Sequence, residues 1–514
     1  MIRHRAALVT ALAVMVAPFM EVLDTSVANV ALPHIAGALG ADTDESTWVL
    51  TSYLVSNAIV LPLSGWLAQV FGRKRLYQAC IALFTASSAL CGMAQSLDAL
   101  ILCRVCQGIG GGALQPLSQA MVRDAFPPER QGMGMAIFGM GVVLAPIVGP
   151  LLGGWLTDNY SWRWIFYINV PAGLLAIILT ALVVDDGSDG RARRGRIGGD
   201  ILGVSLLVIG IGSLEIFLDE GQRLDWFSSQ FILTFAVLAA VGLATLVVWE
   251  LRAPSPVLHL RLLAQPNFAV ACVMMFALGF VLYGSTLILP LFVQTLLGYS
   301  ATLSGLVMSP GGVVVLLSMP VVGALLSRVS PRILTTCGLM CGAAGMVHLS
   351  GLDLQADTQA IVIGRMIQSL GMAFLFVPIN TAAFIAVAPA DNNHASGLIN
   401  LMRNIGGSSG IALITTFIAR RSQEHHARLA EHVSLVDPVV RARLEGLEAR
   451  LVEAGASAAD AVRQADALLQ AALQRQAAQL AFLDAFLLLA SIFVVLIPLA
   501  LTLRGRPHGA VGID

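Results

Sequence analysis

The chain consists of long apolar segments separated by short polar turns. A helix that crosses the hydrocarbon core of a bilayer needs about 20 mostly apolar residues, and segments of this length recur from one end of the chain to the other. We identify fourteen of them, near residues 8–32, 47–70, 76–95, 99–121, 132–155, 163–184, 201–219, 229–249, 267–291, 302–326, 333–351, 359–383, 396–418 and 481–503. The pattern predicts an all-α membrane protein with fourteen transmembrane helices.

The distribution of basic residues predicts the orientation of these spans. Lys74 is the only lysine, so 29 of the 30 basic residues are arginine. An even number of spans places both termini on one side. With that side in the cytoplasm, 17 basic residues fall in cytoplasmic loops and termini, and only Arg163 and Arg223 fall in short outer loops. Because basic residues favour the cytoplasmic side, we expect a multi-pass protein with both termini in the cytoplasm.

The composition excludes several classes of protein. Apolar residues make up 57% of the chain and charged residues 12%, about half the charged share of a typical soluble protein, so a water-soluble enzyme is excluded. The net charge of −1 gives no overall basic field, so no nucleic-acid partner is expected. A Walker A loop requires Gly-Lys-Ser/Thr, whereas Lys74 stands between Arg73 and Arg75. An ATP-driven pump is therefore excluded for this chain alone.

A polytopic membrane enzyme is the main alternative from another functional class. Residues 406–410 match the Gly-x-Ser-x-Gly pattern of a serine nucleophile, but that nucleophile needs a strand-to-helix turn and these residues lie inside a predicted span. The seven cysteines all fall in predicted spans, which favours buried thiols over disulfides. We find no His-Glu-x-x-His motif. The acidic cluster Asp185, Asp186 and Asp189 could in principle hold a metal, but the surrounding Gly and Arg residues favour a solvated linker. No metal or cofactor is expected, so a transporter is the better interpretation.

Two pairs of similar segments indicate an internal repeat. Residues 104–110 resemble residues 365–371 at an offset of 261, and residues 62–67 resemble residues 320–325 at an offset of 258. The first six spans end at residue 184, which is too short for a repeat of about 260 residues. Spans seven and eight and the loop before them account for the remaining length. The repeat predicts two six-helix bundles with two inserted helices, a transporter layout with a central site between the bundles.

This plan predicts the following domains: an N-terminal bundle (1–184), a cytoplasmic Arg-rich loop (185–199), two inserted helices (200–250), five helices of the C-terminal bundle (251–419), an outer helical hairpin (420–478), and a last helix with a cytoplasmic tail (479–514). Within the hairpin, Asp437 and Pro438 are typical of a helix start. Ser457 and Asp460 form a capping box at the start of a second helix.

Five segments carry a resemblance to a known family: 23–33, 65–75, 104–112, 145–154 and 162–171. Over nearly its whole length the chain resembles the major facilitator superfamily, and more closely its fourteen-helix drug:proton antiporter branch. The long loop before the last span is similar to that of the EmrB group of multidrug exporters. Two positions depart from the family pattern, since Gln69 stands where an acid is usual and Ala145 where glycine is usual.

The resemblance implies proton-driven efflux of diverse amphipathic drugs across the bacterial inner membrane. The proton gradient is the implied energy source, and no cofactor is expected. A periplasmic adaptor (membrane fusion protein) and a TolC-like outer-membrane channel are the implied partners, beside the lipid bilayer itself. A dedicated exporter of one metabolite or siderophore on the same fold is the closest alternative.

Two carboxylates on the first span are the candidates for proton coupling. Glu21 and Asp24 are three residues apart and so share a helix face. A charge at the bilayer centre costs about 2.5–3.5 kcal/mol or more, and two close carboxylates resist double ionisation, so the pair is suited to carry a proton. Arg104 lies at a similar predicted depth and is expected to stabilise the ionised carboxylate. The alternatives are a purely structural salt bridge and a carboxylate that only packs a broken helix.

Two further groups of residues have candidate roles. Polar and aromatic side chains within spans are candidates for a polyspecific substrate cavity, with helix packing as the alternative: Asn29, Tyr53, Asn57, Gln107, Glu215, Phe280, Tyr283, Arg365, Gln368, Asn380, Arg403 and Asn404. Small and basic residues are candidates for hinges and gates, because small residues allow close helix approach and proline kinks a helix: Gly65, Gly72, Arg73, Arg75, Gly149, Pro150, Gly153 and Gly154. Tight packing and positive-inside anchoring are the alternatives for the second group.

Overall fold

The computed structural model describes residues 2–41, 43–127, 130–184, 200–254, 256–385, 387–388, 391–433 and 437–504. Every regular element within these ranges is a helix, which confirms the predicted all-α fold class. The predicted Arg-rich loop at 185–199 and the end of the predicted tail at 505–514 lie outside the described residues.

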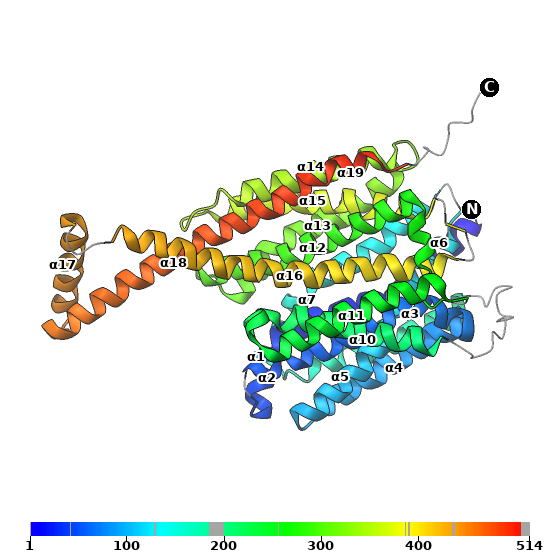
Figure 1. The fold of residues 1–514 in the computed structure, drawn as a ribbon, viewed down its shortest axis with the longest axis horizontal. Coiled ribbons are helices and arrows are strands. Elements are labelled where there is room, and N and C mark those ends of the chain that lie inside the picture. Colours follow the sequence, from blue (N-terminus) through cyan, green and yellow to red (C-terminus); the bar gives the residue numbers. More distant parts are fainter. Residues whose placement is uncertain are drawn as a thin grey trace.

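The first six predicted spans form the N-terminal half (Figure 1). Its helices are α1 (Ile2–Leu39), α2 (Thr43–Ser46), α3 (Trp48–Phe71), α4 (Arg73–Met93), α5 (Leu97–Gly111), α6 (Leu114–Ala125), α7 (Gln131–Asn159), α8 (Trp164–Tyr167) and α9 (Asn169–Val183). Two predicted spans are each divided in two, into α5 and α6 and into α8 and α9. The first break follows a run of glycines. A Cβ on Gly112 would lie 2.5 Å from the carbonyl oxygen of Asn57, so the chain passes too close to α3 there for a side chain.

The inserted pair and the C-terminal half follow in the same order as predicted. The inserted helices are α10 (Ile201–Gly221) and α11 (Gln230–Arg252), with short 3₁₀ turns η3 (Trp226–Ser228) and η4 (Leu260–Ala264). The C-terminal half contains α12 (Pro266–Thr295), α13 (Ala301–Leu325), α14 (Pro331–Leu349), α15 (Thr358–Ala383), α16 (Asn392–Glu431), α17 (Pro438–Glu453), α18 (Ala458–Val495) and α19 (Ile497–Leu501).

Thirteen helices of the described chain are long and apolar enough to cross a membrane. The remaining predicted span, 396–418, lies within α16, which packs along α12 and α18. Its polar residues Asn400, Arg403 and Asn404 lower the mean hydropathy of this segment. With α16 included, the helices agree with the predicted fourteen spans.

The two halves repeat the same packing. Helix α1 packs on α7 as α12 packs on α16, and α3 packs on α5 as α13 packs on α15. The halves meet through two equivalent contacts, α7 with α13 and α3 with α16, while α10 pairs with α11 and packs against α3 and α16. This arrangement confirms the two six-helix bundles with two inserted helices.

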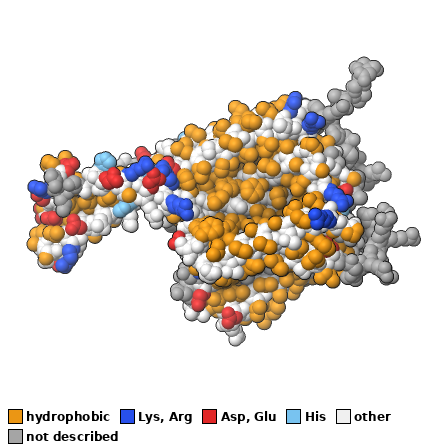
Figure 2. Space-filling view, viewed as in Figure 1, with side chains coloured by type: hydrophobic (Ala, Val, Ile, Leu, Met, Phe, Trp, Pro, Cys, Tyr) orange, Lys and Arg blue, Asp and Glu red, His pale blue; other side chains and the backbone are white. Residues whose placement is uncertain are grey.

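The start of α1 and the end of α19 lie at one end of the bundle, and α17 lies at the other (Figure 1). We call these the terminus end and the α17 end. Beyond the bundle, α16 and α18 continue side by side, and Arg421 of α16 contacts Asp484 of α18 at 2.6 Å. The predicted caps are confirmed, since Asp437 accepts a hydrogen bond from Val439 N and Ser457 accepts one from Asp460 N. Figure 2 shows apolar side chains over the middle of the bundle and charged ones at its ends and on this projection.

Candidate functional site

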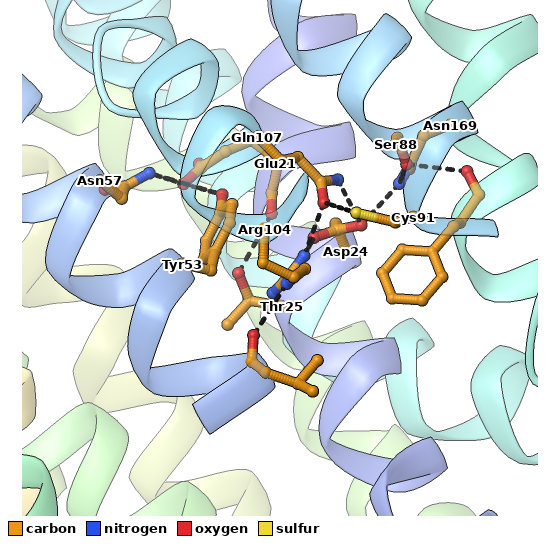
Figure 3. A network of polar contacts seen from close by, with 12 residues as sticks. Glu21, Asp24, Thr25, Tyr53, Asn57, Ser88, Cys91, Arg104, Gln107 and Asn169 are labelled. Atoms are coloured by element: carbon orange, nitrogen blue, oxygen red, sulfur yellow. Dashed lines mark hydrogen bonds and ion pairs between the residues drawn. The ribbon is translucent and has the colours of Figure 1, made fainter. Parts of the chain in front are cut away.

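A buried carboxylate on α1 lies at the centre of a polar network in the N-terminal half (Figure 3). Asp24 is 2% exposed. Its Oδ2 accepts a hydrogen bond from Arg104 Nη1 at 2.5 Å, and its Oδ1 accepts from Gln107 Nε2 at 2.9 Å and Asn169 Nδ2 at 2.6 Å. Three donors and one opposite charge compensate the burial of this carboxylate, as a charge removed from water requires.

The guanidinium of Arg104 is held by three helices. Its Nε donates to the backbone oxygen of Val49 at 2.9 Å, and its Nη1 also reaches Gln107 Oε1 at 2.9 Å. The ring of Tyr53 covers one face at 4.2 Å from its centroid, close enough for a cation–π contact. The ion pair therefore ties α1 to α5 through contacts that also include α3, so a change in the charge of Asp24 would affect all three helices.

Glu21 has a different set of partners. It accepts hydrogen bonds from Tyr53 Oη at 3.2 Å, Asn57 Nδ2 at 3.0 Å and Gln115 Nε2 at 2.5 Å. All three donors are neutral, and Gln115 Oε1 accepts in turn from Arg403 of the other half. The two carboxylates predicted as one pair thus have different hydrogen-bond partners, and Tyr53 contacts both groups of partners. Asp24 is ion-paired within its own half, and Glu21 is linked to the second half through Gln115.

Polar contacts also join the halves along their central line. Gln119 Nε2 of α6 donates to Asn380 Oδ1 of α15 at 2.5 Å, and Gln119 Oε1 accepts from Asn400. One turn further, Arg123 Nη2 donates to the backbone oxygen of Phe384 at 2.9 Å. Both the 119–380 and the 123–384 pair differ by 261 residues, the repeat offset, so the approximate two-fold axis passes between α6 and α15.

The terminus end is closed by contacts between the halves. Asn392 of α16 accepts from Arg123 and donates to Asp124 Oδ1 at 2.9 Å, and Asp124 is paired with Arg73 at 2.5 Å. The predicted basic turn is thus part of this closure through Arg73, whereas Arg75 is exposed. Gly72 in the turn has φ of +83°, a conformation that favours glycine.

A second contact at this end involves the residue that departs from the family pattern. Gln69 Nε2 lies 2.8 Å from His394 Nε2, and the ring of His394 stacks on His259 at 4.0 Å between centroids. Burial, and then the neighbouring His259, lower the pKa of His394 to about 3. A Cβ on Gly65 would lie 2.8 Å from His394 Nδ1 and 2.9 Å from its Cα, so glycine at this position allows α3 to approach α16.

Of the predicted small-residue face of α7, two members contact α1. A Cβ on Gly149 would lie 2.4 Å from Ser26 Oγ, and one on Gly153 would lie 3.1 Å from Val27 Cα. Gly154 has no neighbour closer than 4.0 Å to such a Cβ, and Pro150 is exposed. Close packing of α7 on α1 therefore depends on Gly149 and Gly153, which are four residues apart on α7.

A cavity lies between the halves and is lined by residues of α7, α12, α13 and α15: Val143, Pro146, Leu282, Tyr283, Thr286, Val315, Arg365, Ser369 and Met372. Of the residues predicted to form a substrate cavity, Tyr283 and Arg365 line it, and Gln368 binds Arg365. Asn380 and Arg403 instead take part in the contacts between halves. Sequence analysis did not identify the apolar wall residues or Ser369.

Other predicted cavity residues lie apart from this space. Asn29 is exposed and bonds to Thr25 O of its own helix. Glu215 of α10 accepts from Ser408 of α16 at 2.7 Å, which places the serine of the Gly-x-Ser-x-Gly match within a helix. Phe280 packs against Gly410, and Asn404 is half-buried.

Two partners of the carboxylates were missed by sequence analysis. Asn169 lies in the segment 162–171 that resembles the family pattern, and Gln115 directly precedes Pro116. Both have amide side chains within predicted spans. This polar character in an apolar segment is the feature of the sequence that could have identified them. Among the described residues, no group of three His, Cys, Asp or Glu side chains is arranged to hold a metal ion.

Residues 14–411 match the model of the Major Facilitator Superfamily. The chain belongs to the major facilitator superfamily. Among its relatives in this superfamily, the multidrug export protein EmrB of Escherichia coli K12 is 40% identical over 445 residues, which cover 85% of each chain. The fatty acid resistance protein FarB of Neisseria gonorrhoeae is 37% identical over 81% of this chain and 82% of its own.

A solved major facilitator structure supports the fold. The proton:xylose symporter XylE superposes with a TM-score of 0.58 and 14% identity, over 80% of this chain and 89% of the symporter. The family and the fold class expected from the sequence are therefore confirmed, and superfamily membership makes the chain a multi-pass membrane transporter.

Proposed function

We propose that this protein exports structurally diverse amphipathic compounds across the bacterial inner membrane in exchange for protons, with both termini in the cytoplasm. The names of its relatives support efflux: the EmrB protein of E. coli, 40% identical to this chain, is a multidrug export protein. The lining of the cavity between the halves combines apolar side chains with a few polar ones, which is the kind of surface that amphipathic cargo would contact.

The buried Asp24–Arg104 ion pair is the observation that carries the proposal of proton coupling. A proton on Asp24 cancels the negative charge that compensates Arg104. The bonds between α1 and α5 are then weakened. This changes the relative free energies of the two conformations between which the transporter alternates. Glu21 is positioned to take part as a second carboxylate, since its link through Gln115 to Arg403 crosses to the other half.

Proton exchange can be tested in everted membrane vesicles with a preformed pH gradient. Adding an exported compound to wild-type vesicles should collapse part of the gradient, and Asp24→Asn should abolish this response while the protein remains in the membrane. Asp98→Asn is a matched control, because Asp98 is an exposed carboxylate on α5. A normal response from Asp24→Asn would refute the assignment of Asp24.

We further propose that the projection of α16, α17 and α18 binds a periplasmic adaptor that leads to a TolC-like outer-membrane channel. Its position beyond the apolar band, at the end opposite the termini, supports this role. A photocrosslinker at Val439 of α17, a side chain 75% exposed, should capture the adaptor. One at Leu182, 78% exposed in α9, should not. Equal capture from both positions, or none from Val439, would contradict the docking proposal.

A dedicated exporter of one class of compound is the second candidate function. The similarity to a protein named for fatty acid resistance favours it, because the identity is close to that with EmrB. Resistance profiling of a deletion strain separates the two: sensitivity to many unrelated compounds supports the multidrug function, and sensitivity to one class supports the dedicated one.

A further inference from the structure

The two halves contain the same arginine–glutamine arrangement at equivalent positions. In the first half, Arg104 Nη1 donates to Gln107 Oε1, and Gln107 Nε2 donates to Asp24. Arg365 and Gln368 follow this arginine and glutamine by 261 residues (365 − 104 and 368 − 107). Arg365 Nη1 donates to Gln368 Oε1 at 2.6 Å, so the same bond recurs in the second half.

The carboxylate is the part that differs between the halves. Adding 261 to the position of Asp24 gives Ser285, and Gln368 Nε2 donates to its hydroxyl at 2.5 Å. A hydroxyl carries no charge, so Arg365 lacks the counter-ion that Asp24 gives Arg104. Arg365 is 6% exposed, and among the described residues its Nε has no hydrogen-bond partner and its guanidinium has no salt bridge.

The aromatic cover over the arginine is also missing in the second half. Tyr53 lies over the guanidinium of Arg104, and the repeat offset of this helix, 258 residues, makes Gly311 its equivalent. A Cβ on Gly311 would lie 2.9 Å from Arg365 Cγ and 3.3 Å from Arg365 Nε. Glycine therefore leaves one side of this arginine free of a covering ring.

Arg365 faces the cavity between the halves. Ser369 and Thr286 line the cavity beside it, and the other walls are mainly apolar, including Val143 and Pro146 from the opposite half. The other buried arginine at the centre, Arg403, also has nitrogens without a hydrogen-bond partner, but it donates to Gln115 and lies in electrostatic range of the carboxylate of Glu21. Leaving a buried charge without a partner costs several kcal/mol, so a site with Arg365, hydroxyls and apolar walls is suited to a ligand that supplies the charge.

We propose that Arg365, with Gln368 and Ser285, binds the anionic group of exported compounds, which are amphipathic organic acids with a carboxylate or phenolate head. The ligand's anion occupies the place that Asp24 has in the first half, and its apolar body lies against the α7 wall. Guanidinium–carboxylate hydrogen bonds are short and frequently bidentate, which explains how one arginine provides selectivity in an otherwise apolar space. The inference rests on the proposed export function and names its substrate class.

Equilibrium binding to the purified full-length protein in nanodiscs tests this inference without a proton gradient. The probes are a dansyl-labelled undecanoic acid and the uncharged primary amide of the same compound. The wild type should bind the acid more tightly, and Arg365→Gln should weaken acid binding about tenfold or more while leaving the amide unchanged. Arg365→Lys should retain most of the preference because it retains the charge.

A second variant tests the symmetry argument by adding a group. Ser285→Asp places a carboxylate at the position equivalent to Asp24, so it should occupy Arg365 and abolish the acid preference while the amide still binds. Thermal unfolding of each variant reports folding. Equal weakening of both probes by Arg365→Gln, or an acid preference that persists in Ser285→Asp, would overturn the proposal.

Failure of the export proposal can be recognised separately. If wild-type vesicles show no proton exchange with either probe, proton-driven export is refuted, and the binding preference still decides the role of Arg365. If both probes drive exchange equally and Arg365→Gln changes neither binding constant, export stands and the anion site is refuted.

Discussion

Gln119 of α6 and Asn380 of α15 form a hydrogen bond of 2.5 Å across the contact between the two halves, and their positions differ by 261 residues. Each residue is therefore the repeat equivalent of the other. Gln119 also accepts from Asn400 of α16, so one amide of the first half holds two helices of the second. Because both bonds cross the contact between the halves, any motion that separates α6 from α15 and α16 must break them.

The first prediction concerns this central contact. Gln119→Ala leaves Asn380 and Asn400 without their partner, and a buried unsatisfied polar group costs about 1–3 kcal/mol. We expect the contact between halves to open more often, with faster hydrogen exchange in α6 and α15. Gln95→Ala, which changes an exposed glutamine, is the matched control. Unchanged exchange in α6 and α15 of Gln119→Ala would argue against a role of this amide in holding the halves together.

Apolar segment length was sufficient to predict most helices, because a bilayer allows few other structures for such segments. The offset of 261 between Arg104 and Arg365 was visible in the sequence, and it predicted the repeat that the structure contains. Counting residues also placed Asp24 and Arg104 at similar depth, and the structure shows them in contact. Their roles in coupling stay predictions.

The remaining features depend on helix rotation and packing, which a single sequence does not specify. Glu21 and Asp24 share a helix face, yet they bind different partners: Glu21 bonds to Asn57 of α3, and Asp24 bonds to Arg104 of α5. Asn169 contacts Asp24 across 145 positions, and nothing in its local pattern separates it from other amides in spans. The break between α5 and α6 likewise lies where the chain passes too close to α3 for a side chain at Gly112.

The second prediction concerns the buried ion pair. Arg104→Gln leaves Asp24 charged and buried without its counter-ion, and such a loss typically costs about 3–5 kcal/mol. The double variant Asp24→Asn with Arg104→Gln removes both charges and should recover part of this loss. The thermal unfolding of the four proteins gives the coupling energy. Additive effects of the two substitutions would mean that the pair contributes no coupling.

The third prediction concerns the close contact of α3 with α16 at the terminus end. Gly65→Ala places a methyl group against the backbone of His394, and forced overpacking costs about 1–3 kcal/mol. The closed terminus end should therefore be disfavoured, and cysteine cross-linking between α3 and α16 at this end should slow. Gly305→Ala is the control, because no atom lies within 4 Å of a Cβ there. Equal cross-linking rates in the two variants would show that this glycine does not govern the closure.

The fourth prediction concerns the pH dependence of the same closure. The pKa of His394 is about 3 in the folded protein, below its ordinary value of 6.5, so the unfolded chain binds this proton first as the pH falls. The contribution of His394 to stability is therefore complete above pH 6.5 and is lost progressively between about pH 6.5 and 3, by about 1.4 kcal/mol per pH unit. His259 and Asp391, 3.4 Å apart, are the titratable groups beside it.

His394→Gln keeps an amide that can bond to Gln69 and removes the titrating group. Its unfolding temperature should fall less steeply than that of the wild type between pH 7 and pH 5. His34→Gln, which changes an exposed histidine of α1, should follow the wild type. Parallel curves for all three proteins would exclude His394 as the source of acid sensitivity, and would mean that the contact between Gln69 and His394 does not depend on a neutral ring.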